Sequence, residues 1–258
     1  MRRRPACSAQ WHRGVSGMRH SLYKYYSGRK WAEAFLKGEL LFRSLSYFRD
    51  LEDGQVRGDE NEGTSVYRPE GGLVVKNHTQ GWTGVFKGAF KSTANVEEIL
   101  VFCLSRSLTE RLWEEFGSLV CIEITDIREF CSRIEAALPS SATFPGKPGR
   151  TRLGQPVEYY EETDNCNPRW ALPDMIASAK HRSYSWQDEY RLVFSLTDAL
   201  AFEKIQTQLV GNNVHDLPRS AEHRQYLLKA GKLDDICRVH ISANGEMTET
   251  RTIGEEIK

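Results

Sequence analysis

Tyr184-Ser-Trp-Gln-Asp-Glu-Tyr-Arg-Leu-Val-Phe194 is the most informative segment for the fold, because apolar and polar residues alternate along it. In an extended strand, successive side chains point to opposite faces of the sheet. We therefore expect residues 187 to 194 to form a strand whose buried face carries Tyr190, Leu192 and Phe194. The other face carries Gln187, Glu189 and Arg191. This pattern predicts an amide and a carboxylate about 7 Å apart on a rigid element that can line a cleft.

The segments around this strand predict an irregular mixture of strands and helices. Strands are expected near residues 20–27, 40–44, 99–104, 119–124, 157–160, 237–242 and 247–253. Helices are expected between residue 31 and Gly38, after Thr109, after Asp126, and near residues 174–179, 198–209 and 220–230. The glycines of residues 71–90 indicate hairpins and turns. Without a regular strand-helix-strand rhythm, the fold class is α+β, with mixed, largely antiparallel sheets and packed helices.

Length and composition bound the domain organisation. We expect a single domain over residues 18–258, with a loop or lid near residues 139–155, where prolines and glycines gather. Residues 1–17 lack periodic apolar positions and predict a disordered leader, and Met18 is an alternative start of translation. No apolar run reaches the length of a membrane span. The length of the chain alone is compatible with one large domain or with two small ones.

Charge and cysteine usage narrow the classes of partner and compartment. The chain has 35 basic and 35 acidic residues, so no overall field attracts nucleic acid or anionic membranes. Six cysteines are scattered without a Cys-x-x-Cys pair, and we interpret them as reduced thiols of a cytoplasmic protein. The seven histidines show no ligand spacing that indicates a zinc site.

Four segments together resemble a widespread bacterial family of uncharacterised function, often found near defence genes, that groups distantly with the ADP-ribosyltransferase superfamily. They are Leu22-Tyr-Lys-Tyr25, Leu41-Phe-Arg-Ser-Leu-Ser-Tyr-Phe48, Val101-Phe-Cys-Leu-Ser105 with Leu112-Trp113, and Lys180 with Tyr184 to Arg191. The resemblance covers most of residues 20 to 195. It implies an ADP-ribosyltransferase-like fold and NAD as co-substrate. Family members often carry Glu where this chain has Gln187.

The resemblance also implies roles for individual residues. Glu189 is then the catalytic carboxylate, and Gln187 places the acceptor. Cofactor-binding roles fall to residues of the first two strands and the turn after them, which are Lys24, Ser44, Tyr47 and Phe48. The implied activity is that of an NAD-dependent mono-ADP-ribosyltransferase, a bacterial toxin or phage-defence effector, and it needs no metal. Its partners are a macromolecular acceptor, either protein or nucleic acid, and a neutralising antitoxin.

Two alternatives from other classes remain open. Residues 50–62 are rich in carboxylates whose oxygen atoms suit Mg²⁺, as in a metal-dependent nuclease or phosphodiesterase; they are Asp50, Glu52, Asp53, Asp59, Glu60 and Glu62. The third hypothesis is a non-catalytic interaction module. In that case Glu189 pairs with Arg191 on a strand surface, and Lys24 is an exposed edge lysine.

Overall fold

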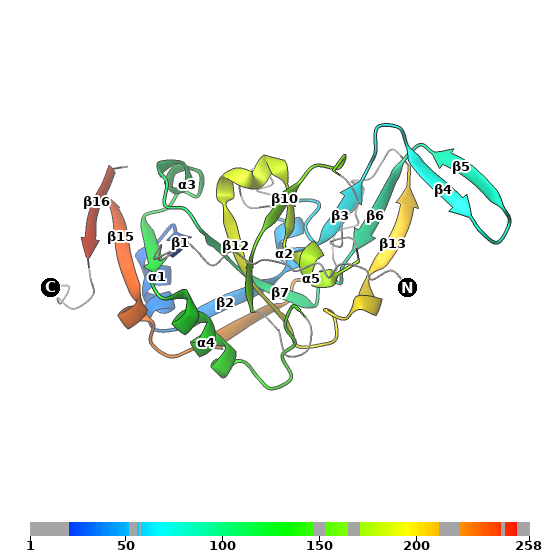
Figure 1. Cartoon of the computed structure of the whole chain (residues 1–258). Coiled ribbons are helices and arrows are strands. Elements are labelled where there is room, and N and C mark those ends of the chain that lie inside the picture. Colours follow the sequence, from blue (N-terminus) through cyan, green and yellow to red (C-terminus); the bar gives the residue numbers. More distant parts are fainter. Residues whose placement is uncertain are drawn as a thin grey trace, which may run out of the picture.

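The computed structural model describes residues 21–51, 56, 58–146, 153–164, 171–211, 222–243 and 246–251. These residues form a mixed α+β fold built around a nine-stranded sheet (Figure 1). All recorded strand pairs within that sheet are antiparallel. The main path runs through β14 (Gln225–Lys229), β2 (Glu39–Ser44), β7 (Ile99–Ser105), β1 (Leu22–Tyr26), β8 (Val120–Ile124), β15 (Cys237–Ala243) and β16 (Glu246–Arg251). The α+β, largely antiparallel class is thus confirmed.

Strand β7 is the branch point of the sheet. Along one edge it pairs over its full length with β12 (Glu189–Ser195), which in turn pairs with β9 (Gly154–Pro156). Along the other edge it pairs with β2 near its start and with β1 at its end. A run of apolar residues suits a strand that is covered on both faces, and β7 is apolar from Ile99 to Leu104.

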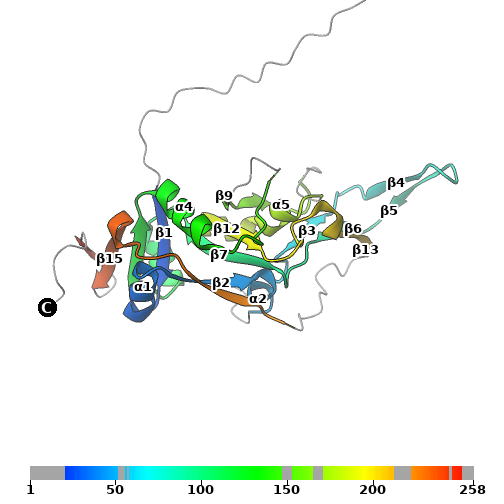
Figure 2. The ribbon, with the colours of Figure 1, turned by 90° about the horizontal axis from the view of Figure 1, so that it is seen from below.

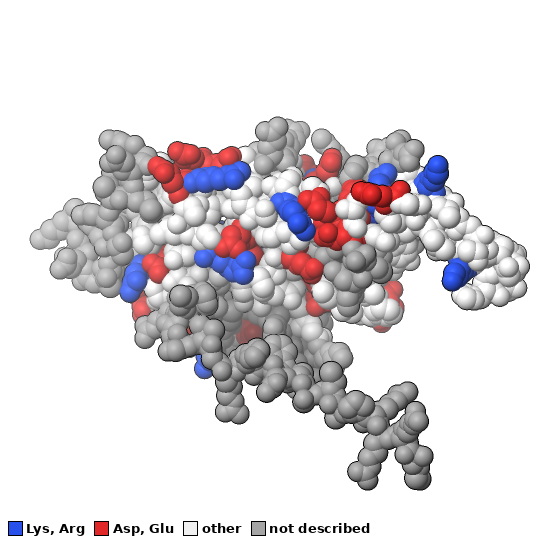
Figure 3. Space-filling model, turned by 45° about the horizontal axis from the view of Figure 1, so that its top comes forward, with Lys and Arg blue, Asp and Glu red and all other residues white. Residues whose placement is uncertain are grey.

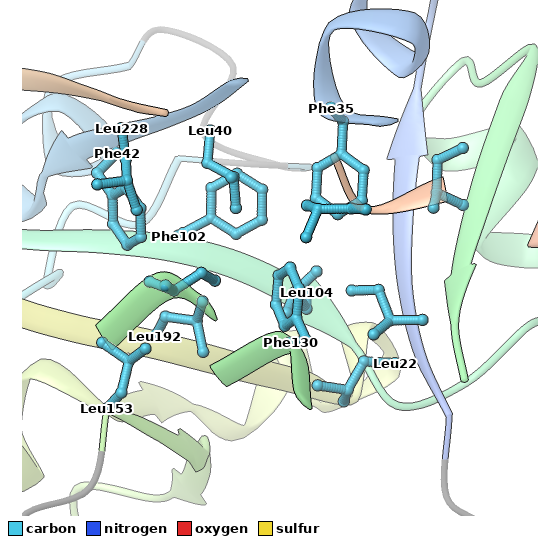
Figure 4. Packing of buried hydrophobic residues seen from close by; sticks show 14 of the residues in the cluster. Leu22, Phe35, Leu40, Phe42, Phe102, Leu104, Phe130, Leu153, Leu192 and Leu228 are labelled. Carbon is cyan, nitrogen blue, oxygen red and sulfur yellow. The ribbon is translucent and has the colours of Figure 1, made fainter. Parts of the chain in front are cut away.

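The largest hydrophobic core lies on one face of this sheet, under α1 (Arg29–Leu36) and α4 (Ile127–Ala137) (Figure 4). Phe35 of α1 and Phe130 of α4 are fully buried there against strand residues such as Phe102. As predicted, Asp126 caps α4 by accepting from the Glu129 amide. Gly38 follows α1 at φ +88°, and a Cβ there would meet the carbonyl oxygen of Gly231, so only glycine fits.

The opposite face is covered by shorter elements. A second core packs around Leu45 of α2 (Leu45–Arg49) and Ile176 of α5 (Pro173–Ala177), and a third around Trp113 of α3 (Glu110–Glu115). Thr109 caps α3 by accepting from the Leu112 amide, as predicted. Further elements on the described chain are β10 (Glu158–Tyr160), β11 (Ala179–His181), and the 3-10 helices η2 (Arg182–Gln187), η3 (Phe202–Lys204) and η4 (Asp234–Ile236).

Besides the parallel pair of β10 and β11, two small sheets complete the arrangement. One runs in the order β13 (Gln206–Val210), β6 (Ala89–Thr93) and β3 (Thr64–Tyr67). The other is a hairpin of β4 (Leu73–Asn77) and β5 (Trp82–Phe86) that extends away from the body of the protein (Figures 1 and 2). The glycines of residues 71–90 predict hairpins and turns, and the described structure has one hairpin there, formed by β4 and β5. None of the helices in the described ranges is long and apolar enough to cross a membrane.

Two predicted helices are wrong. Residues 225–229 form strand β14 because they pair with β2, and Leu228 enters the large core. Residues 206–210 form β13 because they pair with β6, so only η3 is helical within 198–209. In both places pairing with an existing strand edge outweighs local helix propensity. The leader, residues 147–152 of the predicted lid, and Asn244-Gly245 lie outside the described residues.

Candidate functional site

Strand β12 carries the alternation that the sequence predicts. Leu192 and Phe194 are fully buried in the large core, and Tyr190 packs against it. Glu189 and Arg191 point to the other face. That face is not open to water, because Glu189 is only 5% exposed and Arg191 only 1%. The charged side chains on this face of β12 therefore belong to a buried cluster of charged residues.

Arg191 lies at the centre of this cluster, and each of its five N–H groups donates a hydrogen bond. Its Nε donates to Glu189 Oε1 at 2.9 Å, and its Nη2 donates to Glu189 Oε2 at 3.2 Å. Both carboxylate oxygens of Glu62 accept as well, from Nη1 at 2.5 Å and Nη2 at 2.8 Å. The remaining Nη1 proton goes to the carbonyl of Ala177 at 2.7 Å. The planar guanidinium thereby fixes two carboxylates at once.

Lys180 of β11 joins Gln187 to Glu189. Its Nζ donates to Gln187 Oε1 at 2.8 Å and lies 3.4 Å from Glu189 Oε2. The same ammonium stands 4.7 Å from the centre of the Tyr184 ring. Gln187 Nε2 donates to the carbonyl of Val56, at 2.5 Å. The amide and the carboxylate of the Gln-x-Glu pattern thus meet through a shared lysine.

Gln187 does not lie on the strand, which corrects one prediction. It ends η2, and the strand begins only at Glu189. Between them Asp188 adopts the left-handed conformation, at φ 43° and ψ 53°, which is uncommon for a residue other than glycine. Arg106 and Ser107 both bind the Asp188 carboxylate, and the Arg106 amide donates to its carbonyl at 2.8 Å. These contacts hold the turn that aims Gln187 toward Lys180.

The charges of the cluster set the protonation of its carboxylates. Burial raises the pKa of Glu189, but the neighbouring charges of Arg191 and Lys180 more than offset this and hold the pKa far below its usual range. Burial, followed by the charge of Glu62, raises the pKa of Asp59 to about 6. Three carboxylates therefore face two cations. The cluster is neutral when Asp59 is protonated and carries an excess negative charge when it is not.

Two further groups touch Glu189. The amide of Glu189 donates to the hydroxyl of Tyr159 at 2.8 Å. Cys103 of β7 lies opposite Arg191 in the strand register. Burial raises the pKa of the Cys103 thiol, and the nearby charge of Glu189 raises it further. The thiol thus stays protonated, and it does not supply a thiolate nucleophile.

Lys24 lies on the opposite side of the sheet from Glu189. Tyr23, Ser105 and Glu189 are paired side by side across β1, β7 and β12, so they share a face, and Lys24 points to the other one. Its Nζ donates to the Cys103 carbonyl at 2.7 Å and stands 4.4 Å from the centre of the Phe102 ring. This hydrogen bond links β1 to β7 beyond their single recorded pair, Tyr23 with Ser105.

Ser44, Tyr47 and Phe48 belong to a second polar cluster around α2. The fully buried Ser44 Oγ lies 2.7 Å from Ser46 Oγ, and Ser46 Oγ lies 3.3 Å from His223 Nδ1. Tyr47 lies edge-on to Phe48 and under the guanidinium of Arg43. The Phe48 carbonyl accepts from the Asp59 amide at 3.2 Å. The two clusters are therefore linked through the main chain before Glu62.

The acidic loop does not act as a unit within the described residues. Glu62 is committed to Arg191, Asp59 faces the charge cluster, and Asp50 lies beside His223. Glu60 is exposed, whereas Glu52 and Asp53 lie outside the described residues. Over the described ranges, no three His, Cys, Asp or Glu side chains are grouped so that they could hold a metal ion.

Sequence reasoning missed Glu62, Asp59, Tyr159 and Cys103 as neighbours of Glu189. They come from distant segments, and no local pattern marks them as partners. Lys180 lies in one of the four segments that resemble the family. This was the one sequence feature that indicated a role for Lys180 beside Glu189. Comparison with protein-family models, curated proteins and solved structures finds no match to this chain.

Proposed function

We propose that this chain is an NAD-dependent mono-ADP-ribosyltransferase in which Glu189 is the catalytic carboxylate and Gln187 positions the acceptor. The observation that carries the proposal is the state of Glu189, a carboxylate held ionised and immobile by Arg191 and Lys180 at the start of a central strand. A preorganised charge in a partly dry site stabilises a developing opposite charge more than water does.

The chemistry follows from the charge balance of the cluster. Departure of nicotinamide from NAD breaks the glycosidic carbon–nitrogen bond and leaves positive charge on the ribose, and the acceptor then forms the new bond to that carbon. A carboxylate can accept a hydrogen bond from a ribose hydroxyl and offset the positive charge. With Asp59 ionised, the cluster holds one more negative than positive charge, which favours this transition state.

The carbonyl and amide groups of Gln187 fit its proposed role. One side of the amide is fixed by Lys180 and the other by the main chain at Val56. An amide held in this way donates and accepts hydrogen bonds in a defined direction. We further propose that the protein acts in the bacterial cytoplasm as a toxin or phage-defence effector on a macromolecular acceptor.

The deciding experiment is the release of nicotinamide from NAD by the purified full chain. Wild-type protein should release nicotinamide, and Glu189→Gln should lower the rate by roughly two to three orders of magnitude. Glu123→Gln is the matched control, since Glu123 is another strand carboxylate of low exposure, bound by Ser21 and His240. Equal rates in wild type and Glu189→Gln, or no release by wild type, would refute the transferase.

A further inference from the structure

Glu189 and Gln187 are closed off from water in this structure. Glu189 is 5% exposed and Gln187 is 4% exposed. NAD cannot contact a carboxylate that is buried to this extent. If Glu189 is the catalytic carboxylate, an element that covers it has to move before the reaction, as loops do in enzymes that enclose their substrates.

Residues 58–61 contact the side chains that surround Glu189. The Gly58 carbonyl accepts a hydrogen bond from the Tyr184 hydroxyl at 2.9 Å. The centre of the Tyr184 ring lies 4.7 Å from Lys180 Nζ, which in turn lies 3.4 Å from Glu189 Oε2. A path of contacts thus leads from Glu189 through Lys180 and Tyr184 to this segment.

The segment is fixed at its C-terminal end. Glu62 is fully buried, and both of its carboxylate oxygens accept from Arg191. Gly63 follows at φ +69°, and a Cβ there would come within 2.2 Å of Val96 Cγ1, so only glycine fits. Neither residue can leave its place without breaking the buried ion pair or the packing. A movement of residues 58–61 therefore pivots at Glu62.

The side chain of Asp59 gives the segment a charge that its present position disfavours. Asp59 is 2% exposed, and the charged side chains that face it are Glu62, Lys180 and Arg191. Burial, followed by the charge of Glu62, raises the pKa of Asp59 to about 6, although the two cations lower it. Tyr184 faces Asp59 as well, and burial, followed by the charge of Asp59, raises the pKa of its phenol to about 12. The phenol therefore stays neutral, and ionised Asp59 is more stable in water than in the cluster.

Exposed charges on the protein have no such preference. On the face shown in Figure 3, Lys and Arg lie among Asp and Glu, and water and dissolved salt screen charges in such positions. Glu60, the neighbour of Asp59, is exposed, so its carboxylate is hydrated whether or not the segment moves. Ionisation of Asp59, and not of the loop in general, favours a displaced segment.

We propose that residues 58–61 form a cover over Glu189 that opens when Asp59 ionises, and that NAD reaches Glu189 only when the cover is open. The carboxylate of Asp59 then moves into water, while the pivot at Glu62 stays in place. The site is closed in acid and open near neutral pH. The choice of NAD as the ligand rests on the proposed transferase, whereas the opening itself requires no ligand.

Hydrogen exchange of the Asp59 amide measures the opening, because this amide donates to the Phe48 carbonyl at 3.2 Å in the closed form. Its protection factor is taken relative to an unstructured peptide of the same sequence at the same pH. Since Asp59 binds its proton more tightly in the closed form, the protection factor should fall roughly 50-fold between pH 4 and pH 7. In Asp59→Asn it should stay constant, and in the control Glu60→Gln it should fall as in wild type. A wild-type protection factor that does not change with pH would overturn the proposal.

A second amide distinguishes local opening from unfolding of the whole protein. The Val193 amide of β12 donates to the Leu153 carbonyl at 2.7 Å, and Val193 is fully buried. This amide should be more strongly protected than that of Asp59 at every pH. Equal protection of the two amides would mean that Asp59 exchanges only through unfolding, which would also overturn the proposal.

The Tyr184→Phe variant tests the contact that holds the cover closed. It keeps the aromatic ring but removes the hydrogen bond to Gly58, so the protection factor of the Asp59 amide should fall roughly two- to ten-fold. Tyr25→Phe is the matched control, because the Tyr25 hydroxyl also donates to a main-chain carbonyl, that of Ser107, at 2.9 Å. Protection of Asp59 should be unchanged in the control. An unchanged value in Tyr184→Phe would contradict the cover.

Nicotinamide release separates this inference from the proposed function. In an active transferase, kcat/KM for NAD should rise in Tyr184→Phe by the factor by which protection of the Asp59 amide falls, because both follow the open fraction. An unchanged kcat/KM would show that the cover does not control access to Glu189. If neither protein releases nicotinamide, the transferase and the role of NAD are refuted, and exchange of the Asp59 amide still decides whether the cover opens.

Discussion

Arg191 donates to both carboxylate oxygens of Glu62, at 2.5 and 2.8 Å, although the two residues belong to different layers of the fold. Glu62 is fully buried and lies just before β3, while Arg191 lies in the central sheet. Their bidentate pairing therefore ties the segment leading into a small sheet to the strand that carries Glu189. Disturbing either residue should alter both the fold and the candidate site.

Replacing Arg191 with Met should destabilise the protein strongly. The change leaves Glu62 and Glu189 buried without their main cation, and such a loss costs about 3–5 kcal/mol. Chemical denaturation followed by far-UV circular dichroism measures it. The control is Arg133→Met, which removes ion pairs with Glu129 and Asp235 at the surface and should have a much smaller effect. Similar losses of stability in the two variants would contradict a central role for Arg191 in the buried cluster.

The free energy of unfolding should decrease as the pH rises through about 6, because Asp59 then loses its proton in the folded protein. Its pKa is higher in the folded than in the unfolded protein, so the folded protein holds the proton more tightly. The stabilisation is complete below about pH 4, where Asp59 is protonated in both states, and is lost above about pH 6. The difference is about 3 kcal/mol. Asp59→Asn should remove this slope, which urea titrations between pH 4 and 7 can measure.

Activity should have the opposite pH dependence. If the excess negative charge of the cluster favours NAD cleavage, the rate rises as Asp59 loses its proton near pH 6. Asp59→Asn should abolish that rise while Glu60→Gln, a change at an exposed position of the same loop, leaves it intact. A pH–rate profile of nicotinamide release tests the point. A rise that persists in Asp59→Asn would assign it to another group.

The Lys24→Met variant tests whether Lys24 has a structural role or a cofactor-binding role. The methionine can keep the contact with Phe102, but it leaves the Cys103 carbonyl without the ammonium donor. Loss of this hydrogen bond should cost about 1–3 kcal/mol of stability. If Lys24 only closes the sheet, KM for NAD stays unchanged once the protein is fully folded. A raised KM at unchanged kcat would instead place the lysine on the dinucleotide.

Asp188 should tolerate Asn but not Val. Both Asp and Asn enter the left-handed region readily, whereas a β-branched side chain there is strained, and it would also lose the contacts with Arg106 and Ser107. We expect Asp188→Val to lower the melting temperature and to displace Gln187, whereas Asp188→Asn keeps most of both properties. Thermal melts together with the transfer-to-hydrolysis ratio distinguish the two variants.

The sequence predicts those features that depend on neighbouring residues. Thr109 and Asp126 cap helices because a short polar side chain reaches an amide three residues later. The alternation of Tyr190, Leu192 and Phe194 fixes which face of β12 packs on the large core, because the strand period is two. Both rest on local geometry, and both are confirmed.

What the sequence could not predict depends on distant partners. Nothing near Glu62 indicates that Arg191 binds it, and nothing near Leu228 indicates that its segment pairs with β2. Burial of the polar face of β12 was equally hidden, because alternation reveals two faces but not what covers the second. A Glu189→Gln change that looks harmless to stability from the sequence is therefore expected to be costly.

The branching of β7 has a consequence for the order in which the protein can assemble during synthesis. Its long partner β12 and the outer partner of β2, strand β14, both lie late in the chain. A nascent chain that has emerged only as far as α4 therefore presents the apolar edge of β7 without its main partner. Chaperone binding to ribosome-bound intermediates should weaken once Ser195 has left the exit tunnel, because only then can β12 close over that edge.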